Sequence, residues 1–242
     1  MTGVQTCALP IYWCLDPAVV YLNHGSFGAT PRDVLTVQSE LRARLERNPM
    51  QFFVADWEPL HDAARAAVGD FLGARGEDLA VVPNATAGVN AALRAFELAP
   101  GDEVIVTDHE YNACANALRE AAARSGAMVV VATIPLPISD PGEVLEAVVA
   151  RVTSRTRLAL VDHVTSQTGL VFPITELVSA LRARGVETVV DGAHAPGMVP
   201  VDLDALGAAF YTGNLHKWVC APKGAAFLHV RRDLQEIGRA HV

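Results

Sequence analysis

Lysine is almost absent from this sequence. Of the 19 basic residues, only two are lysines, Lys217 and Lys223, and all the others are arginines. Chemistry that needs a primary amine therefore has two candidates in the chain. Positive charge is also the minority, since 19 basic residues face 27 acidic ones and give a net charge of −8. Nucleic acids and anionic membranes attract basic surfaces, so neither is an expected partner.

Long apolar runs and metal-binding cysteine patterns are missing as well. No stretch of about 18 uninterrupted apolar residues occurs, so no membrane span is predicted. The apolar segment 8–11 has no basic region before it and no sustained apolar run, so it does not predict a signal peptide. The four cysteines are scattered without metal-ligand spacing, which predicts no metal site and makes the cytoplasm the expected compartment.

The composition excludes a disordered chain. The 242 residues are 51% hydrophobic and 19% charged, which is enough apolar material for a packed core. This length predicts one large domain, or one large domain with a small additional piece.

Both ends of the chain resemble translated adapter DNA. The codons ACG-TGT-GCT-CTT-CCG-ATC encode Thr6–Ile11, and their reverse complement in a suitable frame encodes the last seven residues, 236–242. The same strand matches a common sequencing-library adapter. We therefore interpret residues 1–11 and 236–242 as adapter-derived artefacts and exclude them from fold reasoning. The natural part is expected to be a fragment of a longer gene product.

Predicted helices and strands alternate along residues 12–235. Thr30 and Pro31 predict a helix start, with a hydroxyl cap and proline at the first helical position. The predicted helices are 30–47, 57–72, 85–98, 111–125, 142–152 and 174–184. The predicted strands are Leu79–Val82, Glu103–Thr107, Ala127–Ala132, Arg157–Val161, Val186–Val190, Leu206–Tyr211 and Ala225–Val230.

This alternation predicts an α/β fold. Short, continuously apolar strands between helices are typical of a parallel sheet that helices cover on both faces. Polar site residues are then expected where strands end in loops, at the carboxyl edge of the sheet. Five predicted strands run into polar loops there: 83–88, 108–112, 162–169, 191–197 and 212–218.

The residue types in these loops suggest a site for an anionic aromatic ligand. Ala85 and Thr86 at a helix start offer unpaired backbone amides, which suit a phosphate. Asp191 follows a buried strand and needs a cationic partner, such as a protonated pyridine nitrogen. Tyr111 could stack on an aromatic ring. Lys217, between His216 and Trp218, could have a lowered pKa and act as an amine nucleophile.

Each of these residues also has an ordinary structural interpretation. Asp191 by itself is as often a turn residue or a cap, and Thr86 usually just begins a helix. Tyr111 is more often a core residue than a stacking residue. A single lysine is usually solvated at the surface. The argument for a site rests on their combination at successive strand ends.

The combination resembles a known family. Asp191–His194, followed by Thr212–Lys217, resembles the core of the class V, fold-type I pyridoxal-phosphate (PLP) enzymes. The segments Tyr21–Gly28, Asn84–Asn90 and His216–Gly224 are similar to signatures of its isopenicillin-N-epimerase-like branch. The resemblance covers essentially all of the chain between its adapter-like ends, and it is specific as a set although each piece is weak.

The resemblance implies an architecture. The fold is expected to be the fold-type I large domain, a mostly parallel seven-stranded sheet flanked by helices in three layers. This PLP-binding domain would occupy residues 57–235, after an N-terminal arm and helix over residues 12–56. The family's C-terminal small domain would be missing, together with the arginine that usually binds the substrate carboxylate. The full-length protein is expected to be a homodimer, and this chain by itself a poor enzyme.

The resemblance also implies roles for the two residues that carry the chemistry. Lys217 would form the aldimine with PLP and shuttle the proton at the substrate α-carbon. Asp191 would pair with the pyridinium nitrogen and keep the ring an electron sink. His194 would lie beside the ring, near its phenolic oxygen or near Asp191. Lys223 would be structural or near the cofactor pocket.

The remaining implied roles concern binding. Tyr111 occupies the position from which the family stacks an aromatic residue or histidine on the ring. Ala85 and Thr86 would hold the phosphate, together with His216 and Asn214. Either Ser166 or Gln167 would reach the phenolic oxygen, and Asn23 and His24 would lie near the amino-acid substrate. No metal is implied.

Several reactions remain open. PLP enzymes can racemise, transaminate or eliminate a β-substituent, and surrounding residues decide the outcome. The main prediction is an aminotransferase class V or isopenicillin-N-epimerase-like enzyme that acts at the α-carbon of an amino acid. The alternatives are a cysteine desulfurase or C–S lyase of the same family, or a nucleotide-binding α/β domain without PLP. The last lacks both a G-x-G-x-x-G fingerprint and a P-loop, and a non-catalytic relative would lack Lys217.

Overall fold

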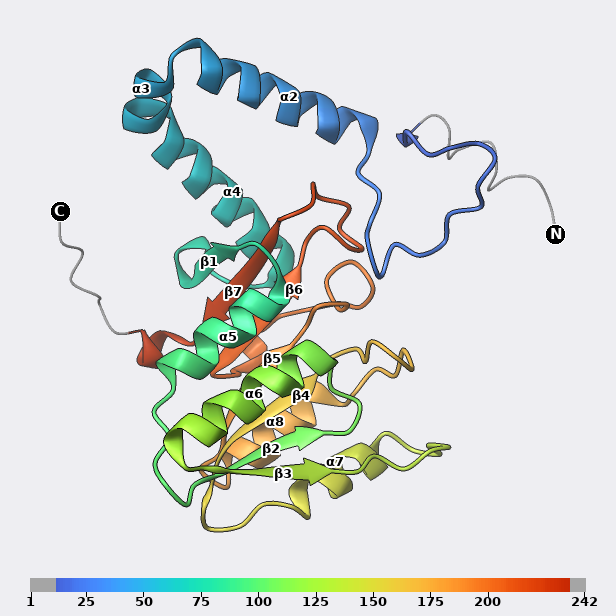
Figure 1. The fold of residues 1–242 in the computed structure, drawn as a ribbon, viewed down its shortest axis with the longest axis vertical. Coiled ribbons are helices and arrows are strands. Elements are labelled where there is room, and N and C mark those ends of the chain that lie inside the picture. Colours follow the sequence, from blue (N-terminus) through green and yellow to red (C-terminus); the bar gives the residue numbers. More distant parts are fainter. Residues whose placement is uncertain (1–11, 236–242) are drawn as a thin grey trace.

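One sheet organises the molecule. The computed structural model describes residues 12–235, and the predicted adapter-derived segments 1–11 and 236–242 lie outside the described residues. Within residues 12–235 seven strands pair in the order β1-β7-β6-β5-β4-β2-β3 (Figure 1). The strands are β1 Leu79–Val82, β2 Glu103–Thr107, β3 Met128–Ala132, β4 Thr156–Asp162, β5 Glu187–Asp191, β6 Phe210–Asn214 and β7 Ala226–Val230. Only β7 runs against the other six of these strands.

Helices cover both faces of this sheet. α5 and α6 pack on one face, and α7, α8, α9 and the end of α4 pack on the other (Figure 1). Their bounds are α4 Trp57–Leu72, α5 Ala85–Ala95, α6 Asn112–Ser125, α7 Gly142–Val149, α8 Ile174–Arg182 and α9 Leu203–Leu206. The predicted three-layer α/β fold with a mostly parallel seven-stranded sheet is confirmed.

The strands are continuously apolar because both faces are buried. In β2, Val104 and Val106 contribute to the core under α5 and α6, whereas Ile105 contributes to the core under α7 and α8. All three side chains are at most 1% exposed. Alternate residues of a strand point to opposite faces, so a doubly covered strand needs apolar residues at every position.

Two local predictions were wrong. The predicted strand over residues 206–211 begins too early, because Asp202 caps the short helix α9 by accepting a hydrogen bond from the Ala205 amide at 3.0 Å. β6 then continues to Asn214, where it pairs with β7. The Thr30 hydroxyl does not cap the following helix. It instead donates to the Ala221 carbonyl at 3.3 Å.

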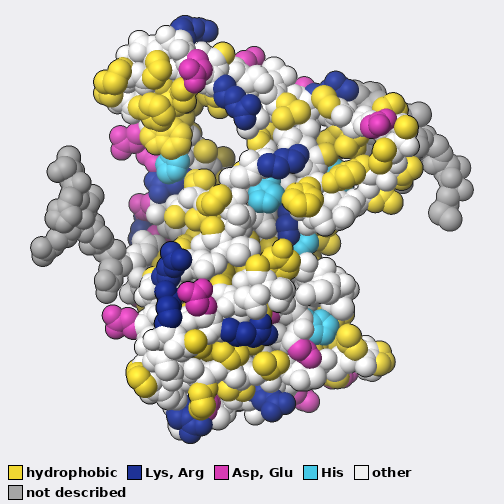
Figure 2. All heavy atoms as spheres, in the orientation of Figure 1, with side chains coloured by type: hydrophobic (Ala, Val, Ile, Leu, Met, Phe, Trp, Pro, Cys, Tyr) yellow, Lys and Arg dark blue, Asp and Glu magenta, His cyan; other side chains and the backbone are white. Residues whose placement is uncertain are grey.

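The N-terminal region consists of a helical part and of a segment that precedes it. α2 Arg32–Arg47 and the short α3 Pro49–Gln51 lead through a π-helical turn into α4, and α2 buries none of its side chains (Figure 1). Apolar side chains gather over the bend between α3 and α4 in Figure 2, where Val54 is 77% exposed. The preceding segment crosses the carboxyl edge, where a Cβ on Gly28 would lie 2.4 Å from the carbonyl oxygens of His216 and Lys217.

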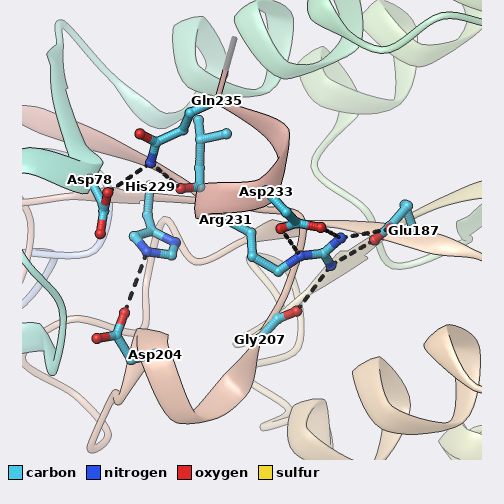
Figure 3. A network of polar contacts seen from close by, with 9 residues as sticks. Asp78, Glu187, Asp204, Gly207, His229, Arg231, Asp233 and Gln235 are labelled. Carbon is cyan, nitrogen blue, oxygen red and sulfur yellow. Dashed lines mark hydrogen bonds and ion pairs between the residues drawn. The ribbon is translucent and has the colours of Figure 1, made fainter. Parts of the chain in front are cut away.

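A charged network fastens the opposite edge of the sheet. Arg231, just after β7, forms a two-pronged ion pair with Glu187 at the start of β5, with distances of 2.8 and 2.9 Å (Figure 3). The same guanidinium also contacts Asp233 and donates to the Gly207 carbonyl. Bidentate contacts of this kind are the stronger type of ion pair. They tie the ends of β5, β6 and β7 together away from the polar loops.

Helix α5 sits so close to the sheet that glycine is required at one position. A Cβ on Gly88 would lie 2.1 Å from the Thr212 hydroxyl oxygen and 2.7 Å from its Cβ. We expect Gly88→Ala to lower the free energy of unfolding by about 1–3 kcal/mol through overpacking. Denaturant unfolding of both proteins tests this. Ala91→Gly, at an exposed position of α5, measures the separate helix-propensity term of about 1 kcal/mol. A Gly88→Ala protein more stable than its parent would contradict the expectation.

Candidate functional site

A cleft of about 910 Å³ opens at the carboxyl edge of the sheet. The loops after β1, β2, β4, β5 and β6 line it, and the N-terminal segment 23–27 closes one side. These loops meet because the carboxyl ends of parallel strands share one edge. The sequence predicted polar site residues at this edge.

Ten of the twelve predicted site residues line the cleft. They are Asn23, Ala85, Thr86, Tyr111, Ser166, Asp191, His194, Asn214, His216 and Lys217. Gln167 is exposed and does not line it. His24 also lies outside the lining: its Nδ1 accepts a hydrogen bond from the Ala29 amide at 3.2 Å, and its ring packs edge-on against Tyr21. Of the two residues predicted for the phenolic oxygen, only Ser166 therefore faces the cleft.

Lys217 contacts a histidine rather than a carboxylate. Its Nζ lies 3.0 Å from His194 Nε2. The other ring nitrogen, His194 Nδ1, accepts a hydrogen bond from the Trp218 indole N–H at 3.4 Å. An indole N–H can only donate, so Nδ1 carries no proton and the neutral imidazole holds its proton on Nε2.

This arrangement favours a neutral Lys217 amine. A proton on His194 Nε2 points at Lys217 Nζ and is accepted by the lone pair that only the uncharged amine has. Burial lowers the pKa of Lys217, although the negative charge of Asp191 opposes this. Burial is the main cause that lowers the pKa of His194, to about 4, so the imidazole is neutral. A neutral primary amine is the nucleophilic form of lysine.

Trp218 should therefore control the protonation of Lys217. In Trp218→Phe the indole donor is lost, so His194 can carry its proton on Nδ1 and present a bare Nε2 lone pair that stabilises the Lys217 ammonium. We expect the pKa of Lys217 to rise, which moves the onset of its reaction with an aldehyde to higher pH. Trapping of pyridoxal phosphate with borohydride across a pH series measures this onset. An unchanged onset, or one at lower pH, would contradict the proposed hydrogen-bond direction.

Asp191 is buried at the end of β5 with 2% of its surface exposed. Its Oδ1 accepts a hydrogen bond from the Ala193 amide at 2.9 Å, and its Oδ2 accepts one from the Cys114 thiol at 3.2 Å. None of the ion pairs among residues 12–235 includes it. A buried carboxylate with two neutral donors and no cation is well suited to receive a positively charged ring nitrogen.

The start of α5 leaves one amide free. The Ala85 amide donates to the Asn214 side-chain oxygen at 2.9 Å, and the Ala87 amide donates to that of Asn84 at 2.8 Å. The Thr86 amide, between them, donates to no acceptor among the described residues. Ala85 and Asn214 therefore hold the helix in place, and Thr86 is the residue that can bind an anion with its amide and hydroxyl.

Two further predicted residues take up clear positions. Tyr111 stands at the start of α6, lines the cleft and is 46% exposed, so its ring is accessible to a ligand. His216 Nδ1 donates to the Ala225 carbonyl at 2.9 Å, so Nε2 is the nitrogen left for a ligand. Lys223 also lines the cleft, and its Nζ lies 3.4 Å from the Thr30 hydroxyl in the N-terminal segment.

Three residues without a predicted role surround Asp191. Cys114 and Glu110 place a sulfur and a carboxylate oxygen within 4.8 Å of an Asp191 oxygen, and Asp162 pairs with Asp191 in the β4–β5 register. Burial raises the pKa of the Cys114 thiol, so the thiol keeps its proton and donates it in a hydrogen bond to Asp191. Glu110 and Asp162 stood in predicted site loops, but no local pattern distinguished them.

The residues that line this cleft lie within a segment that matches a known family. The profile described as Aminotransferase class-V matches residues 20–239. The chain belongs to the aminotransferase class-V family. The resemblance inferred from the loop motifs is thus confirmed. Among residues 12–235, no helix has the length and apolarity needed to span a membrane.

Known relatives have several activities. The chain is 43% identical over 222 residues to isopenicillin N epimerase from Amycolatopsis lactamdurans, a match that covers 90% of this chain and 56% of that protein. It is 32% identical over 229 residues to L-cysteine desulfhydrase from Arabidopsis thaliana, covering 88% of this chain and 50% of that protein. The chain thus spans about half the length of the curated relatives it matches.

Solved structures share the fold. The cysteine desulfurase CsdA from Escherichia coli superposes with a TM-score of 0.80 at 23% identity, over 97% of this chain and 59% of that one. The cystine C–S lyase C-DES, solved with its product cysteine persulfide, gives a TM-score of 0.79 at 24% identity, over 88% of this chain and 57% of that one. Another C-DES structure contains glycine covalently linked to its PLP cofactor.

Proposed function

We propose that the protein containing this chain is a PLP-dependent enzyme that acts at the α-carbon of an amino acid. The observation that carries the proposal is the contact of Lys217 Nζ with His194 Nε2 at 3.0 Å, in a cleft that also contains Asp191. Membership of the aminotransferase class-V family supports it, and so do the named activities of the relatives. The nucleotide-binding alternative has no comparable support.

The donor set in the cleft fits PLP. Asp191 has no cationic partner among the described residues and would pair with the protonated ring nitrogen. The Thr86 amide and hydroxyl, at the start of α5, would hold the phosphate. Tyr111 would cover the ring, and Lys217 would bond to the aldehyde carbon.

When bound, PLP supplies an electron sink that acidifies the Cα–H of an attached amino acid. The residues of this chain do the rest. Lys217 Nζ, in its neutral form, accepts the Cα proton and can return it. His194 Nε2 orients that nitrogen, and Trp218 fixes the histidine proton. Asp191 would pair with the ring nitrogen, and the Cys114 thiol and the Ala193 amide hold its carboxylate in place.

The fate of the proton decides the reaction. Epimerisation is the outcome we propose, supported by isopenicillin N epimerases from two organisms at 43% and 40% identity. C–S bond cleavage is the second candidate, supported by the L-cysteine desulfhydrase at 32%. The predicted homodimer and cytoplasmic location stay predictions.

Isotope exchange separates the two reactions. The protein, in this form and extended to the length of its relatives, is incubated with PLP and a panel of L-amino acids in deuterated water. Epimerisation is expected to give the D-isomer with deuterium at the α-carbon, seen by chiral chromatography and mass spectrometry. Release of sulfide from cysteine or cystine without a D-isomer would favour the C–S lyase. No exchange and no product in the extended protein would contradict both.

A further inference from the structure

Asp162 is a second buried acid at the cleft. It ends β4, and the β4–β5 register places it directly beside Asp191 on the neighbouring strand. Its side chain lines the cleft, yet the residue is only 2% exposed. Both acids therefore reach the same cavity from adjacent parallel strands.

Among the described residues, no other side chain hydrogen-bonds to Asp162. Its Oδ2 is fully buried and makes no hydrogen bond to any described residue, and none of the ion pairs within residues 12–235 includes it. Two basic residues near Asp162 have other partners. His163, its neighbour in the chain, bonds through Nδ1 to the Tyr211 hydroxyl at 2.8 Å. Lys217, in the cleft, bonds to His194. Asp191, by contrast, is held by two donors.

An isolated buried carboxylate beside another carboxylate is unfavourable. Desolvation disfavours the charged form, and repulsion from Asp191 adds to it. Accordingly, burial and then Asp191 raise the pKa of Asp162, and burial, Asp162 and Asp191 raise the pKa of Glu110. Of the three acids, only Asp191 has neutral donors on both of its oxygens. The surroundings of Asp162 therefore favour its neutral form, a protonated carboxylic acid.

A neutral carboxylic acid is a hydrogen-bond donor that needs an acceptor. The described residues supply no acceptor for the acid proton. The small exposed part of the side chain lines the cleft, where a bound ligand can supply one. A carboxylic acid kept neutral by its surroundings can bind a negatively charged oxygen in an enzyme site, as the acid in the ketosteroid isomerase oxyanion hole does.

We propose that Asp162 is a binding residue of the cleft that donates a hydrogen bond, as a protonated acid, to an anionic oxygen of the bound ligand. This inference rests on the proposed function. The oxygen belongs either to the PLP ring or to the carboxylate of the amino acid, and both are hydrogen-bond acceptors of the same kind. The role thus differs from that of Asp191, which binds through its negative charge.

Two substitutions separate a neutral donor from a charged acid. Asp162→Asn keeps the size and a donor but cannot ionise, and Asp162→Ala removes the donor. Asp70→Asn, on the exposed side of α4, is the matched control for a change of one charge. Dissociation constants for PLP, and then for L-amino acids added to the PLP-loaded protein, are measured for each variant. Circular dichroism and thermal unfolding confirm that the variants fold.

The proposal predicts that Asp162→Asn binds within about threefold of the parent, whereas Asp162→Ala binds about 10- to 100-fold more weakly, the range for a hydrogen bond to a charged group. Weaker PLP binding assigns the acceptor to the ring oxygen. Weaker binding of the amino acid alone assigns it to the carboxylate. Equal losses in the Asn and Ala variants, or no loss in either, would overturn the proposal.

A spectroscopic measurement tests the protonation directly. The infrared difference spectrum between parent and Asp162→Asn at neutral pH should contain the C=O stretch of a protonated carboxylic acid, which ionised carboxylates lack. A carboxylate band in its place would overturn the inference even if binding changed. Trapping of PLP on Lys217 with borohydride, at saturating PLP, distinguishes a failure of the proposed function from a failure of this inference. Failure in the parent contradicts the proposed function, whereas trapping in the parent with an ionised Asp162 contradicts only this inference.

Discussion

Lys217→Ala is expected to abolish covalent capture of PLP by this chain. The parent, mixed with PLP and reduced with borohydride, should carry one pyridoxyl phosphate group on Lys217, located by peptide mass spectrometry. The alanine variant should carry none there, because only Lys223 is left as a lysine and its amine lies beside the Thr30 hydroxyl. In the enzyme, loss of the nucleophile that also moves the proton should lower turnover by about 10³-fold or more.

The second lysine provides the matched control. Lys223→Ala should leave the adduct on Lys217, because His194 and Trp218 set the state of that amine and neither contacts Lys223 among the described hydrogen bonds. An adduct that stays in Lys217→Ala and disappears in Lys223→Ala would reverse the assignment. With only two lysines in the chain, the two variants cover every side-chain amine.

Asp191→Asn should have opposite effects on activity and on stability. Asparagine keeps the shape but loses the charge that pairs with the ring nitrogen, and breaking a buried ion pair costs about 3–5 kcal/mol. We expect kcat/KM to fall by about 10²- to 4 × 10³-fold, since each 1.4 kcal/mol corresponds to about tenfold. Steady-state kinetics on the enzyme, with PLP saturating, measures this loss.

In the absence of PLP, Asp191→Asn should not destabilise the protein. Asp191 is buried with no cation bound to it among the described residues, so removing its charge relieves the desolvation of a buried carboxylate. We expect the PLP-free variant to be as stable as the parent, or to have a free energy of unfolding about 1 kcal/mol higher. A variant that loses stability and activity together would mean that Asp191 is structural, which would contradict the assigned role.

Much of the fold is visible in the sequence because its signals are local. The predicted strand Glu103–Thr107 coincides with β2, since a doubly covered strand must be apolar throughout. The error at β6 is local too. Leu206 is apolar like the residues of the strand that follows, but the Asp202 cap and Gly207, at φ 66°, place it at the end of a helical turn.

In the cleft too, local features could be predicted from the sequence and contacts between distant residues could not. The position of Lys217, Asp191 and Thr86 at the cleft could be predicted, because each belongs to a motif of neighbouring residues at a strand end. The contact of Cys114 with Asp191, 77 residues apart, could not be predicted, nor could the use of Asn214 to hold the Ala85 amide. These contacts depend on how α5 and α6 lie across the sheet, and a single sequence does not record that arrangement.

The sequence by itself determined which groups were available: two lysines, the motifs at the strand ends, and the order of strands and helices that brings those ends to one edge. The tertiary structure decided their chemical states. The β4–β5 register sets Asp162 beside Asp191, and the turn after β6 places Trp218 against His194, an arrangement that favours an uncharged Lys217. A side chain's charge in a cleft depends on burial and on neighbours from other strands, and both arise only when the chain is folded.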